Sequence, residues 1–279
     1  ALRKSHRPAS TRRWGRRAWH GGALAMHIKR LAEIAGRFDG MLIDQFGVIH
    51  DGEKLYPGTL EVLKNLSRLK IPVGVMTNSG KRSPANRERL LSLGVPRNFF
   101  VTAISSGEVA YHMIGKKKAF VIGKAQEDYG FDGIPVVGNV AQADVILILG
   151  SDAPNTTMAQ YRDFFSSTSL PAICCNPDKL MLTKQGLQPA PGAIAELYEN
   201  MGGQVQWIGK PYGEIYAAAL KAIGNPRKVL CIGDSAEHDV AGGRGAGLAT
   251  LQVMTGISAG LDPATLRPQA DYVMDAFAW

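Results

Sequence analysis

Short apolar segments alternate with amphipathic segments along most of this chain, from about residue 37 onward. The apolar segments have the length of buried strands, and the segments between them repeat apolar residues at helical spacing. We expect strands at 41–43, 73–76, 119–122, 145–149, 172–175, 229–232 and 249–253, and helices at 59–69, 84–93, 158–165, 193–200 and 212–223. This alternation predicts parallel sheets with crossover helices, which is a doubly wound α/β fold.

Positive charge is concentrated at one end of the chain. The formal net charge is +8, but residues 1–25 hold seven Lys and Arg and no acid, so the rest carries about +1. A nearly neutral body does not favour a nucleic-acid partner. We expect 1–25 to be a disordered tail, upstream of natural synthesis from Met26 or an expression artefact. An organellar targeting peptide is the first alternative, and a nucleic-acid-binding arm is the second.

Two further features of the sequence exclude classes of protein. No apolar run reaches the roughly 18 residues that a spanning helix needs, so no membrane segment is expected. The three cysteines, Cys174, Cys175 and Cys231, form neither an even disulfide set nor a spaced metal motif. A reducing compartment follows, so we expect a cytoplasmic protein without a catalytic cysteine. A homo-oligomer is compatible with the sequence.

Polar residues directly follow three of the expected strands. Asp44 follows 41–43, Thr77 and Asn78 follow 73–76, and Asp234 follows 229–232 after one glycine. The carboxyl ends of parallel strands meet at one edge of a sheet, where ligands bind in such folds. We therefore expect these side chains to lie together.

The residue types at this edge suit phosphoryl transfer. A carboxylate such as Asp44 can attack phosphorus to form an aspartyl-phosphate, and it is also a ligand that Mg²⁺ prefers. The Thr77 hydroxyl and the backbone N–H of Asn78 can bind a phosphoryl oxygen. Each residue taken alone has an ordinary structural explanation, such as a strand end or a turn.

Two further groups complete the pattern. Lys210 precedes an expected helix, where its ammonium can neutralise Asp44 and a phosphate, although an isolated lysine is more often solvated. Asp234 and Asp239 stand five residues apart, so that one can bind a metal while the other orients it or Lys210. A helix N-cap with first-turn acids is the alternative for this pair. Only the ordered set is specific.

That ordered set resembles the four motifs of the haloacid dehalogenase (HAD) superfamily, over nearly all of the chain after residue 37. The segments 56–59 (Tyr-Pro-Gly-Thr) and 174–178 strengthen the resemblance. The gap of about 130 residues between Thr77 and Lys210 is similar to subclass IIA, the NagD or nitrophenylphosphatase-like branch. The resemblance implies a Rossmann-type core at 26–114 and 205–279, with an inserted α/β cap at 115–204.

The resemblance also implies a role for each matching residue. It makes Asp44 the nucleophile, Thr77 the phosphate-binding hydroxyl and Lys210 the charge-stabilising lysine. The implied Mg²⁺ ligands are Asp44, the backbone carbonyl of Phe46, Asp234 and Asp239. The implied substrate-binding residues are Asn78, Asn176 and Asp178.

Phe46 departs from the family pattern. Phosphatases of this superfamily carry a second Asp at that position, which acts as general acid and then as base. Phenylalanine cannot transfer a proton, and such catalysis is typically worth ~10²–10⁴-fold. His50, Asp51 and His238 are candidates for a replacement proton carrier, against a β-turn at 50–52 and a structural role for His238.

Three hypotheses follow for the activity. The first is a Mg²⁺-dependent phosphoric monoester hydrolase that acts on a small phosphorylated metabolite through an aspartyl-phosphate. The second, motivated by Phe46, is a catalytically impaired protein that binds a phosphometabolite or regulates through it. The third is a metal-independent dehalogenase, which is disfavoured because Asp234 would place an unneeded carboxylate beside Asp44. The glycine-rich segment 242–247 follows an expected helix, so it is not a dinucleotide-binding loop.

Overall fold

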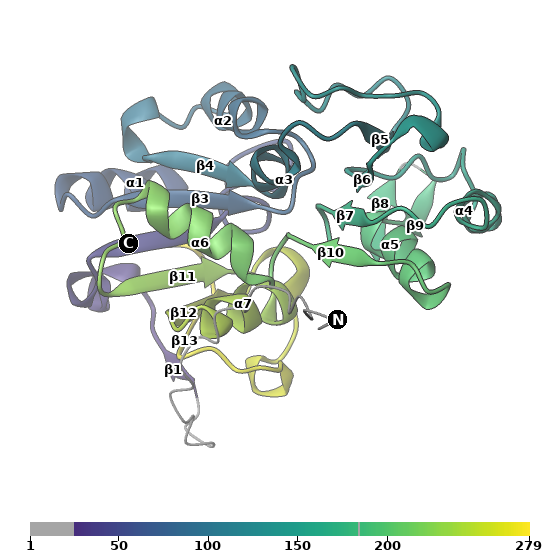
Figure 1. The fold of residues 1–279 in the computed structure, drawn as a ribbon. Coiled ribbons are helices and arrows are strands. Elements are labelled where there is room, and N and C mark those ends of the chain that lie inside the picture. Colours follow the sequence, from purple (N-terminus) through teal and green to yellow (C-terminus); the bar gives the residue numbers. More distant parts are fainter. Residues whose placement is uncertain (1–24, 184) are drawn as a thin grey trace, which may run out of the picture.

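The larger of two parallel sheets forms the body of the molecule (Figure 1). The computed structural model describes residues 25–183 and 185–279. Seven strands lie in the order β1-β13-β12-β11-β2-β3-β4, and every neighbouring pair is parallel. Their bounds are β1 Met26–His27, β2 Gly40–Asp44, β3 Val73–Thr77, β4 Thr102–Ser105, β11 Val229–Gly233, β12 Ala249–Val253 and β13 Tyr272–Met274.

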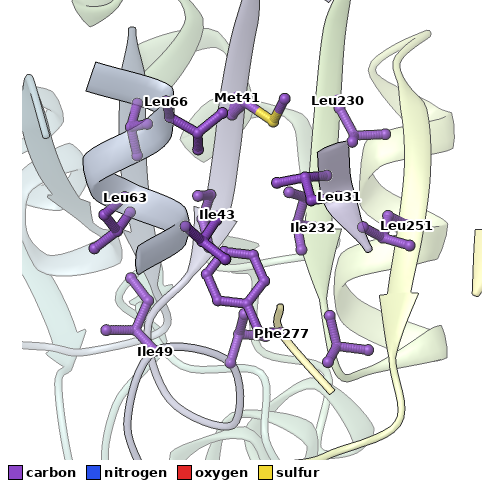
Figure 2. Close-up of a cluster of buried hydrophobic side chains, with 14 of the residues drawn as sticks. Leu31, Met41, Ile43, Ile49, Leu63, Leu66, Leu230, Ile232, Leu251 and Phe277 are labelled. Carbon is purple, nitrogen blue, oxygen red and sulfur yellow. The ribbon is translucent and has the colours of Figure 1, made fainter. Parts of the chain in front are cut away.

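Strand β2, an inner strand of this sheet, is buried on both faces, which explains why its sequence is continuously apolar up to Asp44. Met41 and Ile43 belong to one hydrophobic cluster, with Leu63 and Leu66 from the neighbouring helix α1, residues 59–68 (Figure 2). Leu42 points to the opposite face and belongs to a second cluster. The sheet is therefore a middle layer between two layers of helices.

Helices cover both faces of this sheet. Helices α1 and α2 supply buried leucines to the first cluster, and helices α3 and α6 supply buried residues to the second. The bounds are α1 Thr59–Arg68, α2 Ser83–Ser92, α3 Ser106–Ile114, α6 Gly213–Ala222 and α7 Ala241–Gly245. A single π-helical turn, Ala236–Val240, precedes α7. This arrangement is the predicted doubly wound α/β core.

The smaller sheet lies beside the body and has four parallel strands in the order β10-β7-β6-β5 (Figure 1). One face packs under α4 and α5, where the rings of Phe165 and Tyr198 stack 4.4 Å apart. The other face shares the second cluster with the body, because Leu147 and Ile173 pack there. An antiparallel hairpin, β8-β9, completes this part. The bounds are β5 Ala119–Ile122, β6 Val145–Ile148, α4 Met158–Phe165, β7 Ala172–Cys174, β8 Leu180–Thr183, β9 Gly186–Pro189, α5 Pro191–Asn200 and β10 Val205–Trp207.

The expected fold class is confirmed, since every strand expected from the sequence lies in one of the two parallel sheets. The strands β1, β4, β10 and β13 and the hairpin β8-β9 were not expected, because they are short or edged with polar residues. Strand β10 belongs to the smaller sheet although it follows residue 204, and the boundaries at 115 and 204 stay predictions. The expected tail at 1–25 lies outside the described residues except for Ala25.

Two smaller expectations can be compared with the structure. The glycine-rich segment 242–247 lies in α7 and the turn after it, behind a π-helical turn rather than a strand. Cys174, Cys175 and Cys231 are free and buried, and burial raises the pKa of the Cys174 thiol to about 12. None of the described helices has the length and apolar character required to cross a membrane.

Candidate active site

A pocket of about 400 Å³ opens where β2, β3 and β11 end and the smaller sheet overhangs the body. All of the sequence-predicted site residues line it: Asp44, Phe46, Thr77, Asn78, Asn176, Asp178, Lys210, Asp234 and Asp239. It also includes Ser79, Lys179, Leu180, Ser235, His238 and Ile257. A larger hollow of about 890 Å³ lies beside β4 and contains none of the predicted residues. The chemistry therefore converges on the smaller pocket.

Lys210 lies between two carboxylates at the bottom of the pocket. Its ammonium donates to Asp44 Oδ1 and to Asp239 Oδ1, the latter at 2.6 Å. All three residues are at most 5% exposed. The second oxygen of Asp239 accepts the backbone N–H of Ser235 at 3.1 Å, so both of its oxygens have donors. Asp239 therefore holds Lys210 in place, whereas Asp44 keeps one oxygen turned to other partners.

The carboxylate of Asp234 is held by a backbone N–H group rather than by a side chain. Its Oδ2 accepts the N–H of Ile257 at 2.8 Å, and its backbone carbonyl accepts Ser258 Oγ at 2.6 Å. A Cβ on Gly47 would lie 2.1 Å from Asp234 Oδ2, and one on Gly256 would lie 1.9 Å from it. Both glycines have positive φ, so no other residue fits there easily. The carboxylate is thus clamped between two glycine turns.

Burial sets the electrostatics of this cluster. Burial raises the pKa of Asp44 well above its ordinary value, an effect that Lys210 opposes and the neighbouring carboxylates reinforce. Burial, followed by the charge of Asp239, raises the pKa of Asp234 to about 6. Burial lowers the Lys210 pKa, but Asp239 and Asp44 outweigh it and raise the pKa overall. Lys210 is therefore charged. Its single positive charge does not neutralise all of the neighbouring carboxylates.

A divalent cation would neutralise the remaining negative charge of these carboxylates. Asp44, Asp234 and Asp239 each place an oxygen within 4.8 Å of the others, and all three are buried. Three carboxylates against one ammonium leave two negative charges, which is the charge of one Mg²⁺. Hard carboxylate oxygens are the ligands this ion prefers. The donor set and its charge thus agree with the Mg²⁺ implied by the resemblance. We define Asp44, Lys210, Asp234 and Asp239 as the pocket floor.

Asn78 joins two segments of the body that lie far apart in sequence. Its Oδ1 accepts the backbone N–H of Lys210 at 2.7 Å, and its Nδ2 donates to the Lys210 carbonyl at 3.3 Å. The side chain predicted to bind substrate is thus engaged with the backbone of Lys210. Thr77, one residue earlier, ends β3 and faces the same pocket.

The overhanging part of the pocket comes from the loop after β7. Asn176 Oδ1 accepts the backbone N–H of Asp178 at 2.9 Å, which closes a tight turn within the loop. Asp178 Oδ1 lies 3.6 Å from His238 Nδ1 on the body. Asn176 and Asp178 thus reach the pocket as expected, and Asp178 faces a residue of the core.

His50 does not reach the pocket. It is 1% exposed, and its Nδ1 accepts the N–H of Gly52 at 2.9 Å. Its Nε2 lies 3.1 Å from Gln45 Nε2, while Gln45 Oε1 has no partner among the described residues. A half-turn of the Gln45 amide satisfies both groups with His50 Nε2–H as donor. Burial lowers the pKa of His50 to about 4, so the ring is neutral and fully engaged.

Asp51 is engaged in the same turn. Its Oδ1 accepts the backbone N–H groups of Glu53 and Lys54, each at 2.9 Å, and it does not line the pocket. The structure therefore favours the β-turn interpretation of 50–52 over a replacement proton carrier. His238 does line the pocket.

Sequence reasoning missed the segment 255–258. Thr255 Oγ1 donates to the Gly47 carbonyl at 2.5 Å, and Ile257 supplies the N–H that holds Asp234. The available signal in the sequence was Gly256 itself, because a glycine shortly after an apolar strand marks a sharp turn at the functional edge. In the structure this glycine has a positive φ.

The motifs and the fold match known families and structures. The HAD-hydrolase-like family matches residues 207–279, and the haloacid dehalogenase-like hydrolase family matches residues 41–132. A hydrolase of the haloacid dehalogenase-like family from Brucella suis 1330 is 30% identical, with a TM-score of 0.79, over 90% of this chain and 100% of that one. The chain therefore belongs to the haloacid dehalogenase-like hydrolase family.

Two further relatives narrow this assignment. The ribonucleotide monophosphatase NagD of Escherichia coli K12 is 25% identical over 240 residues, which is 83% of this chain and 94% of that protein. The p-nitrophenyl phosphatase from Archaeoglobus fulgidus is 26% identical, with a TM-score of 0.72, over 86% of this chain and 96% of that one. The chain lies in the NagD and nitrophenylphosphatase-like branch, subclass IIA.

Proposed function

We propose that this chain is a Mg²⁺-dependent phosphoric monoester hydrolase that acts on a small phosphorylated metabolite through an aspartyl-phosphate. One observation carries the proposal: the buried Asp44 is paired with Lys210 at one oxygen, beside two further carboxylates. The relatives named as phosphatases support it, since NagD is a ribonucleotide monophosphatase by name.

Asp44 carries the covalent step. One of its oxygens accepts from Lys210, and the other attacks the phosphorus of the ester. The bond from phosphorus to the ester oxygen breaks, and that oxygen leaves with the electron pair and takes a proton from water. A second water then attacks the phosphorus of the aspartyl-phosphate, which releases inorganic phosphate and restores the carboxylate.

The surrounding residues neutralise and orient. Lys210 compensates the charge of Asp44 and of the incoming phosphoryl group, and Asp239 keeps its ammonium in place. Thr77 Oγ1 and the backbone N–H of Asn78 bind phosphoryl oxygens. Mg²⁺, when bound, supplies charge neutralisation at the phosphoryl oxygens. Of the four ligands implied by the resemblance, Asp44, Asp234 and the Phe46 carbonyl would hold it. Asp239, whose two oxygens accept from Lys210 and Ser235, would support the site through Lys210 instead.

Phe46 makes this active site a variant of the family pattern. Its ring cannot deliver a proton to the leaving oxygen, and neither His50 nor Asp51 lines the pocket. His238 does line it, but its Nδ1 is engaged with Ser235 Oγ at 3.3 Å and faces Asp178 at 3.6 Å. The chain should therefore favour substrates whose leaving oxygen is weakly basic, because such oxygens leave without general acid catalysis. Phenyl phosphates should be cleaved faster than phosphates of simple alcohols.

The test is phosphate release from a panel of aryl and alkyl phosphates, with Mg²⁺ and with excess chelator. We expect release that requires Mg²⁺ and disappears in Asp44→Asn. Release that is unchanged in this variant would overturn the proposal. Halide release from haloacids in chelator is the matching test of the dehalogenase alternative.

The exposed ring of Phe46 favours one second candidate, a protein that binds a phosphometabolite without turning it over. In that case phosphate release would appear in Phe46→Asp but not in the wild type. Calorimetric titration of the wild type with inorganic phosphate and Mg²⁺ would still detect binding. A cytoplasmic setting and a homo-oligomeric state remain further predictions from the sequence.

A further inference from the structure

Three exposed apolar side chains surround the opening of the polar pocket. Phe46, Leu180 and Ile257 are 55%, 60% and 65% exposed, and all three line the pocket. We call them the apolar rim. Isolated exposed apolar residues are ordinary, but several gathered around one binding pocket indicate a ligand that covers them.

The apolar rim is assembled from segments far apart in the sequence. Phe46 follows β2, Leu180 begins β8 on the overhanging hairpin, and Ile257 follows β12. Two of them are tied to the pocket floor, since Phe46 stands two residues after Asp44 and the Ile257 N–H holds Asp234. A phosphoryl group on the floor would therefore direct its ester oxygen and leaving group towards the apolar rim.

The ring of Phe46 is held rigidly. It meets the buried His50 ring edge-to-face, with centroids 5.7 Å apart at 87°. A Cβ on Gly52 would lie 3.0 Å from Phe46 Cε2, so the backbone supports the ring on another side. A surface that is already ordered loses little conformational entropy when a ligand covers it.

The basic side chain of Lys179, which lines the pocket beside Leu180, is already compensated. Lys179 Nζ lies 3.0 Å from Glu196 and 5.0 Å from the centroid of the Trp207 ring. Its charge is therefore not available in full for a second anionic group on the substrate. The Asp178 carboxylate, 3.6 Å from His238, disfavours such a group further.

We propose that the substrate is a phosphate monoester whose leaving group is apolar, with a flat or branched hydrocarbon portion, rather than a polyhydroxylated sugar. This inference rests on the proposed function. The leaving group lies against Phe46, Leu180 and Ile257 while the phosphoryl group occupies the floor.

The test compares two phosphates of primary alcohols, cyclohexylmethyl phosphate and ribose 5-phosphate, so that leaving-group basicity is similar. We expect kcat/KM to be at least about 10-fold higher for the cyclohexylmethyl ester, the scale on which apolar pockets discriminate. Leu180→Asn and Ile257→Asn should each lower that preference several-fold.

Matched controls exist for both variants. Leu187, on the same hairpin, and Leu261, shortly after Ile257, are 67% and 50% exposed but do not line the pocket. Leu187→Asn and Leu261→Asn should leave the preference unchanged, and thermal melting checks that all four variants fold.

Calorimetry with the phosphonate analogues of both esters measures the same preference without turnover. Equal kcat/KM for the two esters, with release that depends on Asp44, would overturn the apolar substrate and leave the phosphatase standing. Absence of release from both esters and from phenyl phosphate, with tighter binding of the apolar phosphonate that Leu180→Asn weakens, would support the apolar rim and overturn the hydrolase. Equal binding of both phosphonates without release would overturn both.

Discussion

At the pocket floor Asp44, Lys210 and Asp239 are at most 5% exposed, whereas Phe46 and Leu180 of the apolar rim are 55% and 60% exposed. Asp44 ends β2 and Asp239 lies in the π-helical turn after β11, and Lys210 joins the two through charged hydrogen bonds. The rim residues come from loops and a hairpin. On the proposed function, the buried floor fixes reactivity, and the loops and the hairpin, which can vary without disturbing the floor, carry selectivity.

The largest effect should follow from Asp44→Asn. The amide cannot act as the nucleophile, so we expect phosphate release to fall by about 10⁴-fold or more, as for loss of other catalytic nucleophiles. Asp51→Asn is the control, because Asp51 lies in the same loop but does not line the pocket. A comparable loss of phosphate release in both variants would contradict a special role of the floor relative to the neighbouring loop.

Lys210→Met should act on stability as well as on activity. Removing one partner of a buried charge cluster costs about 3–5 kcal/mol, because Asp44 and Asp239 would remain without their ammonium. Urea unfolding measures the loss. Mg²⁺ should restore more stability to this variant than to the wild type, since it supplies the missing positive charge. No difference in the Mg²⁺ response would contradict a cation site at the floor.

Phe46→Asp should replace an apolar side chain of the rim with a carboxyl group that takes part in catalysis. A carboxyl group at this position can serve as general acid, and we expect hydrolysis of simple alkyl phosphates to rise by about 10²-fold. Aryl phosphates should gain much less, because their leaving oxygens need no proton. The dependence of kcat on leaving-group pKa reports the difference, and Phe46→Asn controls for loss of the ring. An equal gain on both classes would show that the ring acts by obstruction.

His50 gives a smaller, pH-dependent effect beneath the rim. Its folded pKa is about 4 against an ordinary 6.5, so the unfolded chain binds more protons between these values. Stability from the neutral ring is therefore present above pH 6.5 and declines as pH falls towards 4. Between pH 7.5 and 5 we expect a loss of about 2 kcal/mol in the wild type relative to His50→Gln.

The comparison with His50→Gln is needed because another group titrates in the opposite sense. The raised pKa of Asp234, about 6, makes protonation favour the folded state as pH falls. Urea unfolding of both proteins at the two pH values separates the contribution of His50 to stability from that of Asp234. Parallel pH dependence in the two proteins would show that His50 does not titrate on unfolding.

The fold and the membership of the floor could be predicted because both follow from where strands end. Asp44 and Thr77 stand directly after an apolar run and Asp234 stands one glycine after another, and parallel strands bring such positions to one edge. Lys210 was predicted by its order in the resemblance. The structure places all of them in one pocket.

The remaining contacts could not be predicted because they depend on backbone groups or on the overhanging hairpin. The N–H of Ile257 that holds Asp234 belongs to every residue type except proline. Asn78 looked like a phosphate ligand, and its bonds to the Lys210 backbone depend on how the intervening segment folds. Leu180 reaches the pocket only because the smaller sheet is placed over the body.

The contact between Lys210 and Asp44 spans 166 residues, and Asp239 follows 29 residues further on. During synthesis Asp44 leaves the ribosome long before its counter-ion exists. Closing so long a loop is costly in entropy, and contacts of this separation form slowly. The charge cluster therefore cannot form before Lys210 and Asp239 have been made, and a chain truncated before residue 210 would hold an uncompensated acid at the end of β2.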